Sequence, residues 1–342
     1  MKKKILVTGG TGYIGSHTAV ELIEEGYDVV IIDNLYNSEA EVIDRIFRIT
    51  GVKPGLSVID ICDNEKLNGF FNKHNKIEGI IHFAAFKAVG ESVHKPLEYY
   101  RNNLLSLINL LEAMKVFGIP HLVFSSSCTV YGQPERLPVS EDAPVQPAMS
   151  PYGNTKQIGE EIIRDAVAAG NKIAAISLRY FNPIGAHPTA LIGELPMGVP
   201  ENLVPYITQT AYGLRDELKV FGDDYDTPDG SCIRDYLHVV DLAKAHVTAV
   251  KRLIEKKYKA NYEVFNLGTG NGVSVLEAIK SFERVTGVKL KYKITGRRAG
   301  DIEKIWADPS LANRELGWSA KSTLDESMRT AWDWEKQIRK TR

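Results

Sequence analysis

The sequence predicts an α/β protein built on a doubly wound parallel sheet, with a smaller, interleaved C-terminal α/β domain. Three observations support this fold class. Residues 4–34 form a strand, a glycine turn, a helix and a second strand, which is a βαβ unit. The strand candidates are continuous apolar runs, as expected for a parallel sheet that is covered on both faces. Strand and helix patterns then alternate as far as residue 182, which is typical of Rossmann-type sheets.

The N-terminal elements follow from apolar runs and their boundaries. KILVT at 4–8 predicts the first strand, the helical spacing of 16–25 ends at Gly26, and YDVVIIDN at 27–34 predicts the second strand. The other strand candidates in this half are apolar runs bounded by helical patterns, and they lie at 56–61, 79–85, 121–127 and 173–182.

The C-terminal half is less regular. Residues 183–235 are rich in Pro, Gly and Asp and show few regular patterns, whereas 261–270 again predicts a buried strand, which we expect to return to the first sheet. The last helix carries apolar residues on one face that we interpret as core packing, and these are Leu324, Met328, Ala331 and Trp332. We therefore expect a first domain at 1–182 together with a strand near 236–268, and a second, interleaved domain at 183–235 and 269–342.

Composition and charge exclude several classes of protein. The chain has 342 residues, 44% of them hydrophobic, which suits two domains of common size. Its net charge of -1 provides no basic field for nucleic acid or an anionic membrane. No stretch approaches the roughly 18 apolar residues of a membrane span, and the apolar run after the N-terminal lysines is too short for a signal peptide. Cys62, Cys128 and Cys232 are widely separated and odd in number, so we expect a reduced, cytoplasmic protein.

No metal is predicted. The segment FGDDYDTPDG at 221–230 gathers four aspartates, but Pro228 breaks the pattern of a calcium loop. His238 and His246 are eight residues apart and do not form a close metal-binding pair.

The glycine-rich turn after the first strand predicts a dinucleotide site. TGGTGYIGS places Gly9, Gly12 and Gly15 between a strand and a helix, so the backbone can approach a pyrophosphate near the helix N-terminus. The spacing is GxxGxxG rather than the commoner GxGxxG. Asp33 ends the second strand, where a carboxylate can accept hydrogen bonds from ribose hydroxyls and would repel a 2′-phosphate. This favours NAD over NADP.

SPYGNTK at 150–156 predicts an activated phenol. Pro151 after Ser150 indicates a helix start, and Tyr152 and Lys156 then lie one turn apart on the same face. A tyrosine that works as a base near neutral pH needs its pKa lowered from about 10. The Lys156 ammonium, the helix N-terminus and an oxidised nicotinamide are candidate sources of positive charge.

The serine run at the end of the fifth predicted strand supports this interpretation. Ser125, Ser126 and Ser127 end the strand predicted at 121–127, and open α/β sheets hold their ligands at the carboxyl ends of their strands. A serine hydroxyl at this edge could bridge a substrate oxygen and Tyr152.

Several segments together resemble the extended short-chain dehydrogenase/reductase superfamily and, within it, the UDP-glucose (UDP-galactose) 4-epimerase family. They are TGGTGYIGS, the pair Asp33-Asn34, HFAAFKAVGES, PLEYYRNN, SSSCTVYG, SPYGNTK, LRYFNPIGAHP and IRDYLHVVDLA. The resemblance extends from Lys4 to about Trp334. It implies an isomerase that interconverts UDP-glucose and UDP-galactose through a transient 4-keto sugar, with hydride transfer to and from tightly bound NAD.

The resemblance also implies roles for individual residues. Tyr152 would remove the sugar hydroxyl proton, Lys156 would hold the nicotinamide ribose and lower the phenol pKa, and Ser127 would assist proton transfer. Besides Ser127, Tyr152 and Lys156, the implied cofactor-binding residues are Gly9, Gly12, Tyr13, Ile14, Gly15, Asp33, Asn34, Asn37, Ser38, Asp60, Ile61, Phe83, Ala84, Lys87, Asn102, and Tyr180 or Phe181. Besides Ser127 and Tyr152, the implied substrate-binding residues are Asn182, Asn202, Leu203, Val220, Phe221, Arg234, Arg298, Asp301 and Ile305.

Alternative activities remain to be weighed. A nucleotide-sugar 4,6-dehydratase would carry carboxylates after the strand-end serine, where this chain has Cys128-Thr129, so elimination is disfavoured. Epimerisation of N-acetylated UDP-sugars stays open, because Ile305 is intermediate in size at the position that restricts the sugar pocket in the family. A non-catalytic NAD-sensing module would not need the YxxxK pair, the serine or the arginines. The resemblance further implies a homodimer through helices near 102–117 and 152–168.

Overall fold

The fold is organised around one parallel sheet, as the sequence predicts. The computed structural model describes residues 2–298 and 301–341. Seven parallel strands are arranged in the order β11-β6-β5-β4-β1-β2-β3. Their bounds are β1 (Lys4–Thr8), β2 (Asp28–Asp33), β3 (Gly55–Val58), β4 (Ile77–His82), β5 (His121–Ser125), β6 (Ala174–Tyr180) and β11 (Tyr262–Leu267). The strand order reverses between β1 and β4, and ligands of such sheets bind at this switch point.

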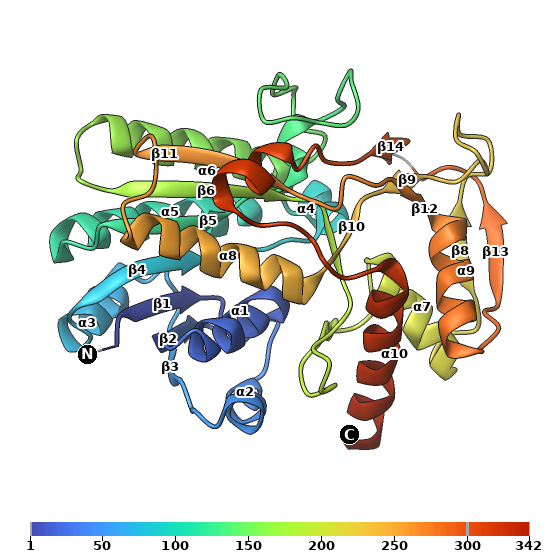
Figure 1. Ribbon diagram of the computed structural model, residues 1–342, viewed down its shortest axis with the longest axis horizontal. Coiled ribbons are helices and arrows are strands. Elements are labelled where there is room, and N and C mark those ends of the chain that lie inside the picture. Colours follow the sequence, from blue (N-terminus) through green and yellow to red (C-terminus); the bar gives the residue numbers. More distant parts are fainter. Residues whose placement is uncertain (1, 299–300, 342) are drawn as a thin grey trace.

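Helices cover both faces of the sheet (Figure 1). Along β1, Ile5 and Val7 pack with α1, α2 and α8, whereas Leu6 packs with α3, α5 and α6. This alternation requires every position of the strand to be apolar, which explains the continuous runs in the sequence. The helices of the first face are α1 (Tyr13–Glu24), α2 (Val42–Thr50) and α8 (Val239–Ile254), and those of the second are α3 (Asn64–Lys73), α5 (Pro96–Phe117) and α6 (Pro151–Ala168).

A second group of elements lies beside the sheet, on the right in Figure 1. It has its own core, in which α7, α9 and α10 pack around residues such as Ile207, Phe282 and Met328. The remaining elements are α4 (Val89–His94), η1 (Cys128–Tyr131), β7 (Asn182–Ile184), α7 (Leu203–Tyr212), β8 (Leu218–Phe221), β9 (Ile233–Arg234), β10 (Tyr236–His238), β12 (Val273–Ser274), α9 (Val275–Thr286), β13 (Tyr292–Thr295), β14 (Lys304–Ile305), η2 (Ala312–Leu316) and α10 (Leu324–Thr341).

The C-terminal predictions are confirmed in part. The strand predicted at 261–270 is β11, and it pairs with β6 at the edge of the main sheet. The predicted face of the last helix packs into the second core, where Met328 and Ala331 are buried and Leu324 and Trp332 lie against them. The expectation of few regular elements at 183–235 is wrong at α7, whose Pro205 lies in the first helical turn, where proline is tolerated.

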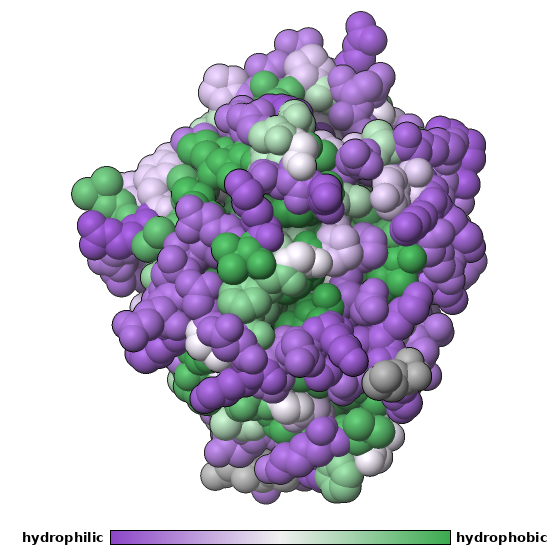
Figure 2. All heavy atoms as spheres, turned by 90° about the vertical axis from the view of Figure 1, so that its left-hand side faces the viewer, coloured by the Kyte–Doolittle hydropathy of each residue, from purple (hydrophilic) through white to green (hydrophobic). Residues whose placement is uncertain are grey.

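The surface shows no extended apolar belt on the side that Figure 2 displays, where hydrophobic groups lie in small clusters among hydrophilic ones. Within the described residues, every helix is too short or too polar to cross a membrane.

Candidate active site

The glycine turn forms a tight cradle at the switch point of the sheet. Gly9 has φ +69°, and a Cβ on it would lie 2.8 Å from the backbone nitrogen of Ala84. A Cβ on Gly15 would lie 2.2 Å from the carbonyl oxygen of Gly9. Helix α1 begins after Gly12, which provides no side-chain cap for the first-turn amides. These amides and the bare backbone fit a dinucleotide pyrophosphate.

Asp33 fastens this cradle to the end of β2. Its buried carboxylate accepts hydrogen bonds from the backbone nitrogens of Thr11 (3.1 Å) and Leu35 (2.9 Å) and from the hydroxyl of Ser38 (3.1 Å). The Ser38 hydroxyl also lies 2.7 Å from that of Thr11. The sequence predicts a ribose-binding carboxylate here, and the structure adds a role in holding the glycine turn.

Tyr152, Lys156 and Ser127 meet at the carboxyl edge of the sheet. Helix α6 begins at Pro151, as predicted, and the hydroxyl of Ser150 caps it by accepting a hydrogen bond from the Gly153 nitrogen at 3.1 Å. Tyr152 and Lys156 are both buried, with the Lys156 Nζ 5.8 Å from the centre of the Tyr152 ring. The Ser127 side chain lies near the phenol and favours its ionised form.

The serine turn after β5 anchors the lysine as well. The Lys156 Nζ donates to the carbonyl oxygen of Ser125 at 2.7 Å, and it lies 4.9 Å from the centre of the Phe124 ring. The hydroxyl of Ser125 lies 2.6 Å from that of Tyr180. The turn therefore joins α6 to β6 beside the buried Tyr152.

Burial dominates the ionisation of this pair. It raises the pKa of Tyr152 above its ordinary value, with Tyr180 acting in the same direction, whereas the nearby Ser127 side chain lowers it. Burial also lowers the pKa of Lys156 to about 8, against the opposing charge of Glu160. The positive charges predicted from the sequence would lower the phenol pKa, but burial has the larger effect and raises it. A phenolate at this position therefore needs strong cationic stabilisation.

The predicted substrate arginines gather around one carboxylate. Asp301 accepts hydrogen bonds from Arg298 at 2.7 and 3.1 Å and lies 3.9 Å from Arg234. The Arg298 guanidinium lies 5.4 Å from the centre of the Phe221 ring, next to the buried Val220 at the end of β8. Two guanidinium groups, that of Arg298 beside an aromatic ring, suit a nucleoside diphosphate.

Residues assigned to the cofactor and to the substrate also meet at Glu194. Its Oε1 accepts hydrogen bonds from the Lys87 Nζ at 3.0 Å and from the Asn202 Nδ2 at 2.6 Å. Lys87 lies 6.0 Å from the centre of the Tyr13 ring, and the Tyr13 hydroxyl donates to the carbonyl oxygen of Gly185 at 2.7 Å. Glu194 is not among the site residues predicted from the sequence.

Other predicted residues lie along the same edge of the sheet. The Asp60 carboxylate accepts a hydrogen bond from the Cys62 nitrogen at 2.9 Å, and the Cys62 thiol donates to the Asn102 carbonyl at 3.6 Å. Ala84 follows β4 and approaches Gly9. The remaining predicted residues differ in exposure: Asn34 and Asn37 are exposed, Ile14, Phe83, Asn182 and Leu203 are partly buried, and Ile61 is buried.

Two predicted positions face a separate hydrophobic cluster. Phe181 and Ile305 are buried together with Val130, Tyr131 and Ala307. Of the alternatives Tyr180 and Phe181, only Tyr180 directs a polar group to the serine turn.

The comparisons with known proteins agree over nearly the whole chain. Residues 6–331 match the family described as GDP-mannose 4,6 dehydratase. A UDP-glucose 4-epimerase of Yersinia enterocolitica is 50% identical over 97% of this chain and 97% of its own.

Solved structures also match nearly the whole chain. One is a UDP-glucose 4-epimerase from Stenotrophomonas maltophila with bound NAD and formylated UDP-arabinopyranose, with a TM-score of 0.96 and 49% identity, covering 99% of this chain and 100% of the other. Another, from Bifidobacterium longum in complex with NAD+ and UDP, has a TM-score of 0.94 and 46% identity, with 98% of both chains covered.

Proposed function

Because the chain belongs to the UDP-glucose 4-epimerase family, we propose that it is an NAD-dependent isomerase that interconverts UDP-glucose and UDP-galactose at C4. The observation that carries this proposal is the meeting of Tyr152, Ser127 and Lys156 beside the glycine cradle, at the carboxyl edge of the sheet. The same family membership supports residues 1–182 with 236–268 as the NAD-binding part, and 183–235 with 269–342 as the part that holds the nucleotide sugar. A cytoplasmic location is part of the proposal.

The residues of this chain divide the proton chemistry among them. Tyr152 removes the proton of the sugar 4-hydroxyl, and the hydroxyl of Ser127, which lies near the phenol, bridges the two oxygens. The Lys156 ammonium, held by the Ser125 carbonyl, favours the phenolate that burial disfavours. Bound NAD would supply a hydride acceptor, so that loss of the hydroxyl proton and of the C4 hydride would give a transient 4-keto sugar. Return of the hydride to the other face of C4, and of the proton to its oxygen, would give the C4 epimer.

The proposed binding residues hold NAD on one side of Tyr152, Ser127 and Lys156 and the UDP-sugar on the other. Gly9, Gly12 and Gly15 admit the pyrophosphate of NAD, and Asp33 binds its adenosine ribose. Arg234 and Arg298 bind the UDP diphosphate, which would compete with Asp301 for the guanidinium groups. The other residues implied by the family resemblance complete the two sites.

The sugar range is tested by incubating the purified protein with UDP-galactose and, separately, with UDP-N-acetylgalactosamine. We expect UDP-glucose to form from the first substrate, and product analysis by chromatography measures both rates. Ile305→Ala should raise the N-acetyl rate relative to the galactose rate, because it removes side-chain volume beside Phe181. Val139→Ala, in the same buried cluster, is the matched control and should leave the ratio unchanged. Absence of a C4 epimer from both substrates would overturn the proposed function.

The proposed assembly is a homodimer through α5 and α6. The exposed apolar residues of α5 are spaced so that they lie along one side of the helix, and they are Leu97, Leu105, Ile108 and Val116. Light scattering should therefore give twice the chain mass of 38.0 kDa. Leu105→Lys combined with Ile108→Lys should lower this value towards one chain, because it places two charges in the interface. A single-chain mass for the unmodified protein at all concentrations would contradict the dimer.

A further inference from the structure

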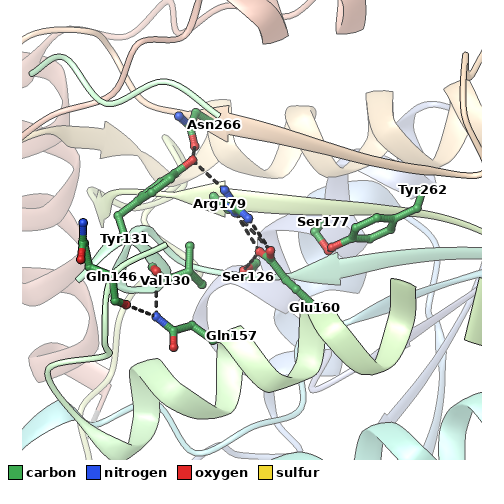
Figure 3. A network of polar contacts seen from close by, with 10 residues as sticks. All are labelled: Ser126, Val130, Tyr131, Gln146, Gln157, Glu160, Ser177, Arg179, Tyr262 and Asn266. Atoms are coloured by element: carbon green, nitrogen blue, oxygen red, sulfur yellow. Dashed lines mark hydrogen bonds and ion pairs between the residues drawn. The ribbon is translucent and has the colours of Figure 1, made fainter. Parts of the chain in front are cut away.

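Figure 3 shows a buried polar network whose central carboxylate, Glu160, lies one helical turn after Lys156 in α6. The Glu160 carboxylate, on α6, accepts hydrogen bonds from Arg179 of β6, with Nη2 at 2.6 Å and Nε at 2.9 Å. Its Oε1 also accepts a hydrogen bond from the hydroxyl of Ser126 at 2.5 Å. All three side chains are buried. Glu160 thus joins helix α6 to both β6 and the serine turn.

The network meets the site at the serine turn. Ser126 stands between Ser125, whose carbonyl oxygen accepts a hydrogen bond from Lys156, and Ser127, which lies near Tyr152. Glu160 follows Lys156 by one turn of the same helix. The Glu160 carboxylate therefore fixes helix α6, which carries Lys156, to the serine turn, whose Ser125 carbonyl accepts the lysine's hydrogen bond.

Arg179 is itself held from the far side. Its Nη1 donates to the Tyr131 hydroxyl at 3.0 Å, and this hydroxyl donates to the Asn266 Oδ1 of β11 at 2.6 Å (Figure 3). A buried ion pair is weak evidence of a gain in stability, because apolar residues of similar volume often serve as well. Its position behind the reacting groups is consistent with a role in the chemistry.

We propose that Glu160 is a positioning residue of the reaction, which with Arg179 fixes α6 against the serine turn and keeps Lys156 protonated. The inference rests on the proposed function, since it assigns to Lys156 the stabilisation of the Tyr152 phenolate. It requires the two charges of the pair to act on Lys156 in opposite directions.

The surroundings of Lys156 make its charge sensitive to this pair. The groups that face it are the Ser125 carbonyl and Phe124 ring of β5, Tyr152 and Glu160 of α6, and His82 of β4. Burial, with the Lys156 charge in second place, lowers the pKa of His82 to about 3, so this imidazole is neutral at working pH. Tyr180 and Arg179 approach from β6, with Arg179 paired to Glu160.

The test is the pH dependence of kcat/KM for UDP-galactose in single variants. The active ammonium of Lys156 is lost as pH rises through its pKa of about 8, so the unmodified protein should lose activity on the alkaline side. The fall of kcat/KM at high pH is called the alkaline limb. Glu160→Gln leaves the Arg179 cation unbalanced, and the alkaline limb should move to lower pH by about one unit. Arg179→Gln leaves the Glu160 carboxylate unbalanced, and the limb should move to higher pH by a similar amount.

Two control variants separate charge from packing. Arg179→Lys keeps the cation but loses the paired hydrogen bonds, and Ser126→Ala removes one bond without changing charge. Both should lower kcat with the limb unmoved. NAD content and melting temperature verify that each variant is folded, and if Arg179→Gln fails this check, the comparison of Glu160→Gln with Ser126→Ala decides.

Unmoved limbs in folded Glu160→Gln, or shifts of the same sign in both charge variants, would overturn the inference. Such a result would leave the proposed function intact, because the unmodified protein would still form UDP-glucose. Failure of the proposed function would instead appear as an inactive unmodified protein.

Discussion

Replacement of Tyr152 by phenylalanine is expected to lower kcat for UDP-galactose roughly 10²- to 10⁴-fold, the range of one general acid–base group. The substitution removes only the hydroxyl, which lies near Ser127 and which we propose takes the sugar proton. The ring is buried, so its packing should remain and NAD should stay bound. Steady-state rates and the NAD content of the purified variant are the two measurements.

A second tyrosine provides the matched control for this change. Tyr262, on β11, is partly buried and has its hydroxyl 3.0 Å from that of Ser177. Tyr262→Phe therefore deletes a hydrogen-bonded phenol of the same kind and should keep near-normal turnover. Turnover of Tyr152→Phe at the level of Tyr262→Phe would remove Tyr152 from the role of base.

The sequence was sufficient to predict the fold and the central residues of the site because both follow from local spacing. Continuous apolar runs predict strands that are buried on both faces, and β1 is such a strand. The four-residue interval between Tyr152 and Lys156 places them on one helical face, and Ser150-Pro151 marks where that helix begins. These features need no knowledge of distant contacts.

The network behind the site was missed because it depends on contacts across the sheet. Glu160 lies in a helix with many exposed charges, and nothing local distinguishes a carboxylate that faces the sheet. One signal was available: Arg179 stands in an otherwise apolar strand, and a buried arginine requires an acidic partner. The partner itself could not be chosen without the fold. The raised pKa of Tyr152 was missed for the same reason, since burial is a property of the assembled site.

The glycine cradle gives the second large effect, because its geometry depends on the absence of side chains. At Gly15 an added Cβ would approach the Gly9 carbonyl oxygen to 2.2 Å and the Gly10 Cα to 2.9 Å. Both are backbone atoms, so no side chain can turn aside. Relief requires the turn to move away from α1, and this would displace the amides that receive the pyrophosphate.

Gly15→Ala is therefore expected to lose bound NAD, and with it activity, and to be destabilised by about 1–3 kcal/mol, as overpacked sites are. The NAD released on denaturation and the denaturant midpoint measure the two effects. Gly69→Ala is the matched control, since Gly69 lies in α3 with no heavy atom within 4 Å of its added Cβ. It should keep NAD and gain about 0.5–1 kcal/mol from the higher helix propensity of alanine. Full retention of NAD by Gly15→Ala would show that the turn can yield without losing its ligand, and the cradle would then not be the binding element.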